Sequence, residues 1–207
     1  MWRGTATERG VEMVLRGAPL GEAEAFALAE YQKLCVGEVT DDIEAEGSLI
    51  APMVRQSQNW KTHANLEPLA ATQLKVETWL DGVSIPVIGY VDFTFMDGAD
   101  IDLKTTKACP SKPRPDHVRQ VALYNKARER PAALLYVTDK KHAFYQPTQD
   151  DLDSAVAELT SAGRSLERFL SVMPDADTAI RSVPHQTDHY AYGEAAKSKL
   201  LEVMEAF

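Results

Sequence analysis

Two aspartates and a lysine interrupt a stretch whose other residues are typical of β-strands. Asp92 lies within one apolar run, and Asp102 and Lys104 lie within the next run along the chain. Aspartate is depleted in strands, and a carboxylate that leaves water requires a partner, a metal ion or a proton. The three side chains therefore indicate either a structural ion cluster or a divalent metal site, whose oxygen ligands would select Mg²⁺ or Mn²⁺.

The position of Asp92 relative to Asp102 depends on the turn between the two strands. A two-residue turn would place Asp92 opposite Leu103, toward the core. A three-residue loop over 96–98 would place it opposite Asp102 instead. We expect the three-residue loop, because its last position favours a left-handed residue and Gly98 adopts that conformation without strain. The same register predicts a core face formed by Val91, Phe93, Phe95, Ile101 and Leu103.

This register would bring the Asp92 and Asp102 side chains within roughly 5 Å of each other at their Cβ atoms. Two negative charges at that distance cannot both stay ionised at low cost, so one pKa rises or a cation binds. Lys104 shares a face with Asp102, because side chains alternate along a strand, and it could offset part of the charge.

The rest of the chain supplies the elements that would position these residues. Helical patterns cover 6–16, 21–35, 41–60, 116–130, 148–172 and 194–206, and strand patterns cover 72–80, 86–95, 99–106, 132–139 and 142–146. Asp116 and Thr148 are expected as N-caps of their helices. The expected core-facing stripe of the second helix is formed by Ala25, Leu28, Ala29 and Leu34. No linker is visible, so we expect a single domain over 1–207.

Composition is that of a globular protein, with 44% hydrophobic and 26% charged residues among 207. No apolar run approaches the roughly 18 residues that span a bilayer, and no secretory signal is visible, so we expect a cytoplasmic protein without a membrane partner. Cys35 and Cys109 are too few for a disulfide framework or for a four-cysteine iron–sulfur cluster, so neither is expected.

The charge is unevenly distributed along the chain. The net charge is −9, which argues against a protein that coats nucleic acid with its whole surface. From Lys104 to Lys141, however, ten basic and three acidic residues give a net charge of +7. Such a strip, beginning at the candidate site, would suit a polyanionic substrate, and the alternative is a solvated helix face.

Four short motifs surround these residues in order along the chain. They are Gly4-Thr5-x-x-Glu8, Gly89-x-x-Asp92, Asp102-x-Lys104 and Gln120-x-x-x-Tyr124. As an ordered set they resemble the motifs of the PD-(D/E)XK nucleases, in the RecB-like branch that includes phage-type exonucleases.

The resemblance implies a restriction-endonuclease-like α/β core, in which helices flank a central mixed β-sheet. It implies that Glu8, Asp92, Asp102 and the carbonyl of Leu103 bind Mg²⁺ or Mn²⁺. Lys104 would orient or deprotonate the attacking water. Gln120 and Tyr124, four residues apart on one helix face, would lie against the site and contact phosphate or base. The candidate DNA contacts are Lys107, Lys112, Arg114, His117 and Arg119.

Several of these roles have a structural alternative. The run from Thr5 to Glu8 is also a capping box, in which Glu8 would accept a backbone N–H. Tyr124 can be a core aromatic and Gln120 a solvent-facing helix residue.

The activity implied by the resemblance is metal-dependent hydrolysis of DNA phosphodiester bonds. We expect an exonuclease that acts in recombination, repair or end processing in the cytoplasm of a bacterium or of a phage-infected host. The alternatives are an endonuclease of the same fold and a catalytically silent DNA-binding or scaffold protein. Besides DNA, a homo-oligomer and a single-strand annealing protein are candidate partners.

Overall fold

The computed structural model of the protein describes residues 2–36, 42–64, 66–96, 98–175, 178 and 181–182. The helices are α1 (Trp2–Leu15), α2 (Leu20–Leu34), α3 (Asp42–Ser48), α4 (Ile50–His63), α5 (Pro115–Arg128) and α6 (Gln149–Val172). The strands are β1 (Leu69–Thr78), β2 (Val87–Phe95), β3 (Asp100–Thr105), β4 (Ala132–Val137) and β5 (His142–Tyr145). The chain divides into two compact units, Met1–Thr160 and Ser161–Phe207.

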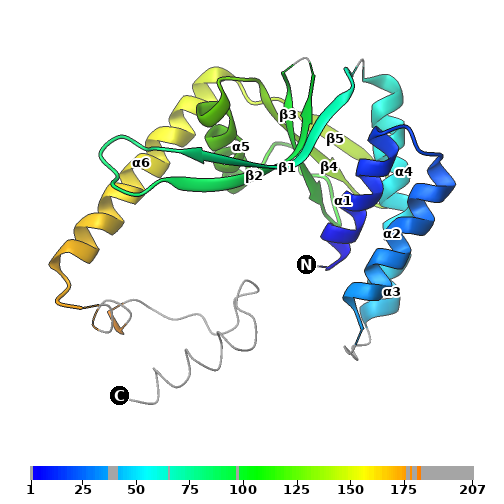
Figure 1. Cartoon of the computed structure of the whole chain (residues 1–207), viewed down its shortest axis with the longest axis horizontal. Coiled ribbons are helices and arrows are strands. Elements are labelled where there is room, and N and C mark those ends of the chain that lie inside the picture. The colour runs from blue at the N-terminus through cyan, green and yellow to red at the C-terminus, as the bar shows by residue number, and fades with distance from the viewer. Residues whose placement is uncertain are drawn as a thin grey trace. The chain divides into compact units, whose positions relative to one another are not determined.

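A five-stranded mixed sheet forms the centre of the first unit. The strands lie in the order β1-β2-β3-β4-β5, and neighbours are antiparallel except for the parallel pair β3 and β4. A parallel pair needs a crossover connection, and α5 supplies it. Figure 1 shows α1 to α4 grouped on one side of the sheet and α5 on the other. The predicted α/β class with a central mixed sheet is confirmed.

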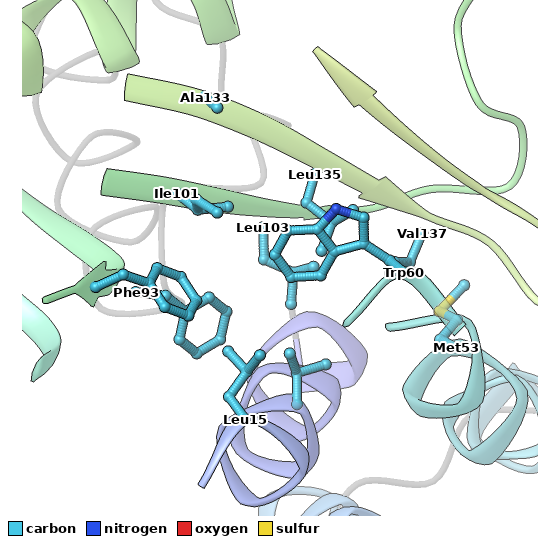
Figure 2. Packing of buried hydrophobic residues seen from close by; sticks show 11 residues of the cluster. Leu15, Met53, Trp60, Phe93, Ile101, Leu103, Ala133, Leu135 and Val137 are labelled. Carbon is cyan, nitrogen blue, oxygen red and sulfur yellow. The ribbon is translucent and has the colours of Figure 1, made fainter. Parts of the chain in front are cut away.

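One face of the sheet is covered by α1 and α4. Alternate residues of β3 and β4 are buried there, namely Ile101, Leu103, Ala133, Leu135 and Val137. Figure 2 shows Leu15 of α1 and Met53 and Trp60 of α4 pointing into the same space, together with Phe93 of β2. Burying each of the larger side chains contributes about 1.5–3 kcal/mol, so this cluster holds α1 against β3.

The opposite face is covered by α5 and by the first part of α6. The strand residues buried there include Val76, Val91, Leu134 and Tyr136, and the helical ones include Val121, Tyr124, Leu152 and Ala155. All six residues of β4 are buried, as predicted for an interior strand that helices cover on both faces.

Helices α1, α2 and α4 pack closely because small residues lie at their contacts. A Cβ atom on Gly10 would lie only 2.7 Å from Cβ of Ala27 and 2.8 Å from Cγ2 of Val54. The buried residues of α2 are Ala23, Ala27, Glu30 and Tyr31. Of the predicted stripe, Ala25, Leu28 and Ala29 are exposed and therefore wrong, whereas Leu34 is partly buried against the core. Close packing at this contact selects small side chains, and Leu28 is 39% exposed.

Several helix boundaries differ from those predicted, beginning with α1, which starts at Trp2 and not at residue 6. The stretch predicted as one helix over 41–60 contains α3 and α4, which meet at Leu49. Pro52 does not interrupt α4, because it lies in the first turn, where the backbone N–H has no helical partner. Helix α5 begins at Pro115 with Arg114 at the N-cap position, so the predicted cap at Asp116 is wrong. Proline is favoured at the first helical position because its φ is already helical.

Thr148 caps α6 as predicted. Its Oγ1 accepts the backbone N–H of Asp151 at 3.2 Å, and Oδ2 of Asp151 accepts the backbone N–H of Thr148 at 3.0 Å. These reciprocal bonds satisfy N–H groups that the helix itself leaves unpaired. The helix predicted over 194–206 lies outside the described residues. Within the described ranges, no helix is long and apolar enough to cross a membrane.

The register of β2 against β3 is the predicted one. The Cα partners are Phe93–Ile101 and Thr94–Asp100. This register places Asp92 level with Asp102. The backbone N–H of Phe95 donates to the carbonyl of Ala99 at 2.9 Å, and Gly98 has a left-handed φ of +104°. Position 97, in the middle of the loop, is outside the described residues.

One residue of the predicted core face of β2 lies on the opposite face of the sheet. Phe93 and Phe95 belong to the cluster beneath α1 and α4, as expected, but Val91 belongs to the cluster beneath α5. Odd-numbered positions of β2 therefore change faces between Val91 and Phe93.

Strand β1 changes faces at the same level. Oγ1 of Thr72 bonds Oε1 of Glu12 on α1 at 3.2 Å, whereas Leu74 packs with the cluster beneath α5. Gln73, between them, has a φ of +48°. A residue in the left-handed region breaks the alternation of side chains on which the prediction depended.

Candidate active site

The backbone pairing of strands β2 and β3 ends next to Asp92, where the two strands separate. One residue beyond the Phe93–Ile101 pair, Oδ2 of Asp92 accepts a hydrogen bond from the backbone N–H of Leu103 at 2.8 Å. The carboxylate therefore takes the place that a backbone carbonyl would have in a continued ladder. This bond fixes Asp92 at the point where the two strands separate.

Asp102 projects from β3 and its side chain is fully buried. Its Oδ2 lies 2.7 Å from Nζ of Lys104, the next residue on the same face. The ion pair lacks hydrogen-bond geometry, so among the described residues Oδ2 is a buried acceptor without a hydrogen-bond partner. Buried acceptors are almost always satisfied, and Oδ2 is held by the ion pair with Lys104 alone, so its lone pairs could also accept a second cation.

Helix α5 presents Gln120 and Tyr124 to this pair. Nζ of Lys104 donates to Oε1 of Gln120 at 2.7 Å, and Nε2 of Gln120 donates to the hydroxyl of Tyr124 at 2.6 Å. That hydroxyl donates to the carbonyl of Tyr90 at 2.7 Å and lies 3.3 Å from Oδ1 of Asp102. Together with the ion pair, these contacts close a ring of four side chains. Gln120 therefore faces the site rather than solvent.

Tyr124 is both a core aromatic and a member of this ring of side chains. Its side chain is only 1% exposed, and its ring lies among the residues beneath α5. The aromatic ring of Tyr124 fits against β2 because Gly89 has no side chain. A Cβ atom there would lie 3.0 Å from Cε1 of Tyr124. The glycine of the Gly89-x-x-Asp92 motif is thus explained by packing.

Glu8 reaches the site from α1. Gly4, one turn earlier, lies against the end of β3, where an added Cβ would be 3.4 Å from Oγ1 of Thr105. The carboxylate of Glu8 accepts a hydrogen bond from the side-chain amide of Gln73. The capping-box alternative is wrong, because α1 begins at Trp2 and Thr5 lies inside the helix.

The three carboxylates carry more negative charge than their surroundings neutralise. Burial, followed by the charges of Asp102 and Glu8, raises the pKa of Asp92 to about 8. Burial raises the pKa of Asp102 although Lys104 opposes the change. Burial also raises the pKa of Glu8 against the opposing hydrogen bond from Gln73. Raised pKa values of this origin favour protons or a cation at the site.

Asp100 shows what a neutralised carboxylate looks like on the same face of β3. Its side chain is fully buried, and Oδ1 accepts a hydrogen bond from Oγ1 of Thr94 at 2.9 Å. Oδ2 accepts a hydrogen bond from Nε of Arg128 at 2.6 Å. Both oxygens are satisfied, so Asp100 has a structural role.

The residues present fit a hard divalent cation. Carboxylates from α1, β2 and β3 converge, and no group in the described ranges forms a hydrogen bond to the buried Oδ2 of Asp102. Even so, within the described part of the chain no three His, Cys, Asp or Glu side chains already have a metal-binding arrangement. Oxygens of Glu8 and Asp92 accept hydrogen bonds from Gln73, and the second oxygen of Asp92 accepts the N–H of Leu103.

The cations predicted to contact DNA lie in the loop before α5 and in the first turns of α5, and most are paired within the protein. Arg114 forms two hydrogen bonds to Asp116, at 3.0 and 2.9 Å. Arg119 pairs with Glu158 at 3.1 Å. Lys107, whose side chain is 82% exposed, lies 3.8 Å from Glu46, and Lys112 is exposed in the proline-rich loop.

His117 is held within the protein rather than directed to solvent. Its Nδ1 lies 2.7 Å from the hydroxyl of Tyr136, and the two rings pack with their centroids 5.5 Å apart. Burial, and then the charge of Lys104, lowers the pKa of His117 to about 4. The histidine is therefore neutral at physiological pH.

Gln73 is a site residue that the sequence did not indicate. Its Nε2 donates to Glu8 and to Oδ1 of Asp92, the latter at 3.0 Å. The alternating pattern placed Gln73 on the same face as Lys75 and Glu77, both of which are exposed. No local signal distinguished it from those two residues.

Comparisons with known proteins bear on the fold. Neither a protein-family model nor a curated protein matches the chain. A solved structure from Eubacterium rectale, named "Putative exonuclease", is similar with a TM-score of 0.51 and 14% identity, over 86% of this chain and 72% of that one. The fold is restriction-endonuclease-like. At this identity the similarity describes the arrangement of elements and not the activity.

A second structure, named SSO0001, matches with a TM-score of 0.38 and 18% identity, over 82% of this chain and 94% of that one. A score this low does not bear on the fold.

Proposed function

We propose that the protein is a Mg²⁺- or Mn²⁺-dependent exonuclease that hydrolyses DNA phosphodiester bonds in recombination, repair or end processing. One observation carries the proposal. Glu8, Asp92, Asp102 and Lys104, which come from three different elements, meet where β2 and β3 part. Buried carboxylates that their neighbours leave unneutralised, beside a fixed ammonium group, suit metal-assisted hydrolysis of a phosphodiester.

The cation would be held by the carboxylates of Glu8, Asp92 and Asp102 and by the carbonyl of Leu103. When bound, such an ion offsets the charge of the phosphate and acidifies a coordinated water. Carboxylate and carbonyl oxygens favour Mg²⁺ or Mn²⁺ over softer metals.

We assign to Lys104 the role of orienting or deprotonating the attacking water. Its ammonium group is fixed from two sides, by Oδ2 of Asp102 and by Oε1 of Gln120, each at 2.7 Å. An ammonium group has three hydrogens, of which Gln120 accepts one, so hydrogens remain available beside the ion pair with Asp102. The side chain is 21% exposed, so such a hydrogen can reach a water or a phosphate oxygen at the site.

Gln120 and Tyr124 support the proposal as positioning residues. Gln120 holds the ammonium group of Lys104, and Tyr124 holds the amide of Gln120 while it anchors itself to the carbonyl of Tyr90. Because the hydroxyl of Tyr124 is engaged inside the protein, we assign it to the orientation of Lys104 and Asp102 and not to contact with a base.

DNA would approach over the start of α5. Lys107, Lys112, Arg114 and Arg119 remain the proposed phosphate contacts. Exposed ion pairs contribute at most about 1 kcal/mol, so phosphates can replace Asp116 and Glu158 as partners at little cost. His117, which is neutral and bonded to Tyr136, is the weakest of the proposed contacts.

The test is digestion of DNA in Mn²⁺, Mg²⁺ or EDTA. The substrates are linear duplex labelled at either end, linear single strand and a covalently closed circle. We expect metal-dependent loss of linear DNA alone, and no cutting by Lys104→Ala. The matched control is Lys33→Ala, which removes an exposed lysine of α2 and should leave the rate unchanged.

The other outcomes would assign a different function. Cutting of the closed circle would identify an endonuclease of the same fold. Binding of DNA without turnover in any metal would indicate a DNA-binding or scaffold protein. Turnover by Lys104→Ala would remove the lysine from the proposed chemistry.

A further inference from the structure

Gln73 adopts a backbone conformation that glutamine rarely takes. It lies inside β1 with a φ of +48°, and β1 continues on both sides of it. The left-handed region costs a non-glycine residue about 1–2 kcal/mol. Such strain persists only where the surroundings determine it, and it gathers at functional sites.

The left-handed backbone changes the direction of the Gln73 side chain. In a regular strand, Thr72 and Leu74 would share a face, and Gln73 would point away from both. Here Thr72 faces α1 and Leu74 faces α5. The side chain of Gln73 lies at this change of face, where it meets Glu8 of α1 and Asp92 of β2.

A glutamine amide suits the space between two carboxylates. Its Nε2 carries two hydrogens and therefore can donate to both groups at once. The residues that it joins are 65 and 19 positions away along the chain. Asp92 is also held by the N–H of Leu103, whereas the hydrogen bond that fixes Glu8 comes from Gln73.

We propose that Gln73 is a positioning residue for the divalent cation, because its amide ties Glu8 to Asp92 and sets the spacing of these two carboxylates. The proposal rests on the proposed function in that it takes the two carboxylates as ligands. Hydrogen bonds to metal ligands are worth about 10- to 100-fold in metal affinity. Without the amide, Glu8 would lose the hydrogen bond that ties it to the side of Asp92, and the cation would lose a pre-set ligand.

The experiment is calorimetric titration of Mn²⁺ into the metal-free full chain. Gln73→Gly removes the amide and keeps a residue that adopts positive φ without strain. We expect its Kd for Mn²⁺ to rise about tenfold or more while its Tm changes little. Gln73→Ala, which also lacks the amide, should show a similar loss of affinity.

The matched control is Glu129→Gly. Glu129 is the other described non-glycine residue with positive φ, at +53°, and it ends α5. Glycine there relieves the same kind of strain, so we expect a higher Tm and an unchanged Kd. This control separates relief of backbone strain from loss of the amide.

Three results would overturn the proposal. An unchanged Kd in Gln73→Gly would show that the amide does not position the ligands. If Gln73→Gly bound Mn²⁺ normally while Gln73→Ala bound it weakly, the loss of affinity would come from the backbone conformation alone. No Mn²⁺ binding by the wild type would refute the proposed metal-dependent function as well, so the two failures are distinguishable.

Discussion

Two buried carboxylates on β3 differ in how fully their neighbours satisfy them. Asp100 and Asp102 lie two positions apart on one face of β3, and both are fully buried. Asp100 has Arg128 and Thr94 as hydrogen-bond partners, whereas one oxygen of Asp102 has an ion pair without a hydrogen bond. Residue type alone does not separate the two, since both occupy the same alternating pattern. Their partners decide the role of each.

At the scale of single residues, the titration of His117 makes the free energy of unfolding depend on pH. Burial and the charge of Lys104 lower its pKa to about 4 in the folded protein, against the opposing charge of Asp116. Between that value and the ordinary pKa of about 6.5, the unfolded chain binds more protons than the folded one. The contribution of His117 is therefore fully present above about pH 6.5 and is lost as the pH falls toward 4.

The check is urea unfolding of wild type and His117→Gln across this pH range. Glutamine can still bond the hydroxyl of Tyr136 but does not titrate. We expect the free energy of unfolding of the variant to fall less steeply with acid than that of wild type. Parallel profiles for the two proteins would contradict the assignment.

At the scale of elements, the site depends on how closely α5 approaches β2. Tyr124 can reach Asp102 because Gly89 leaves room for its ring. Helices α1, α2 and α4 use the same device, with Gly10 against Ala27 and Val54. Glycines at these contacts help to determine where the candidate site side chains are held.

Gly89→Ala tests this dependence. The added methyl group must displace the ring of Tyr124, and with it Gln120 and Lys104. We expect the rate of digestion at saturating Mn²⁺ to fall about 10- to 100-fold, because small displacements of catalytic groups have effects of this size. The control is Gly21→Ala in α2, where a Cβ meets nothing within 4 Å.

The control should leave the rate unchanged and should not lower the free energy of unfolding, since alanine is the better helix former and Gly21 has open space around it. A normal rate in Gly89→Ala would show that Tyr124 does not position Lys104 through this contact.

At the scale of the whole molecule, an acidic protein is proposed to bind a polyanion. The net charge is −9, while the segment from Lys104 to Lys141 carries +7. Much of that positive charge is paired, as with Arg128 and Asp100 or Arg119 and Glu158. Under the proposed function, the exposed Lys107 and Lys112 would then contribute to the electrostatic part of DNA binding.

The salt dependence of the affinity for DNA measures the contribution of these cationic side chains. We expect the affinity for single-stranded DNA, followed by fluorescence anisotropy in EDTA, to fall with salt on a log–log plot. Replacing Lys107 and Lys112 by alanine should reduce the slope by about 1.4, at about 0.7 per phosphate contact. Lys33→Ala should leave the slope unchanged. A double variant with the wild-type slope would remove both lysines from the proposed contacts.

Much of the fold and part of the site were predictable from local patterns. The β2–β3 register followed from the requirement of one loop position for a left-handed residue, which Gly98 meets. The interior strand β4 followed from an unbroken apolar run, and the spacing of Gln120 and Tyr124 placed both on one face of α5. In each case the deciding interactions lie within a few residues of each other along the chain.

Other features depended on partners far apart in the chain. The bond from Gln73 to Glu8 spans 65 residues, and the change of faces at Gln73 and Asp92 contradicts the alternation that sequence patterns assume. The pairing of Arg119 with Glu158 and the small-residue contacts of α2 are likewise set by packing between elements.

By itself, therefore, the sequence determined most of the elements, the pairing of β2 with β3 and most of the candidate site residues, because periodicity and turn geometry are local. Only the tertiary structure decided which of those side chains meet. That outcome depends on the backbone path at Gln73 and on the packing of α1 and α5 against the sheet.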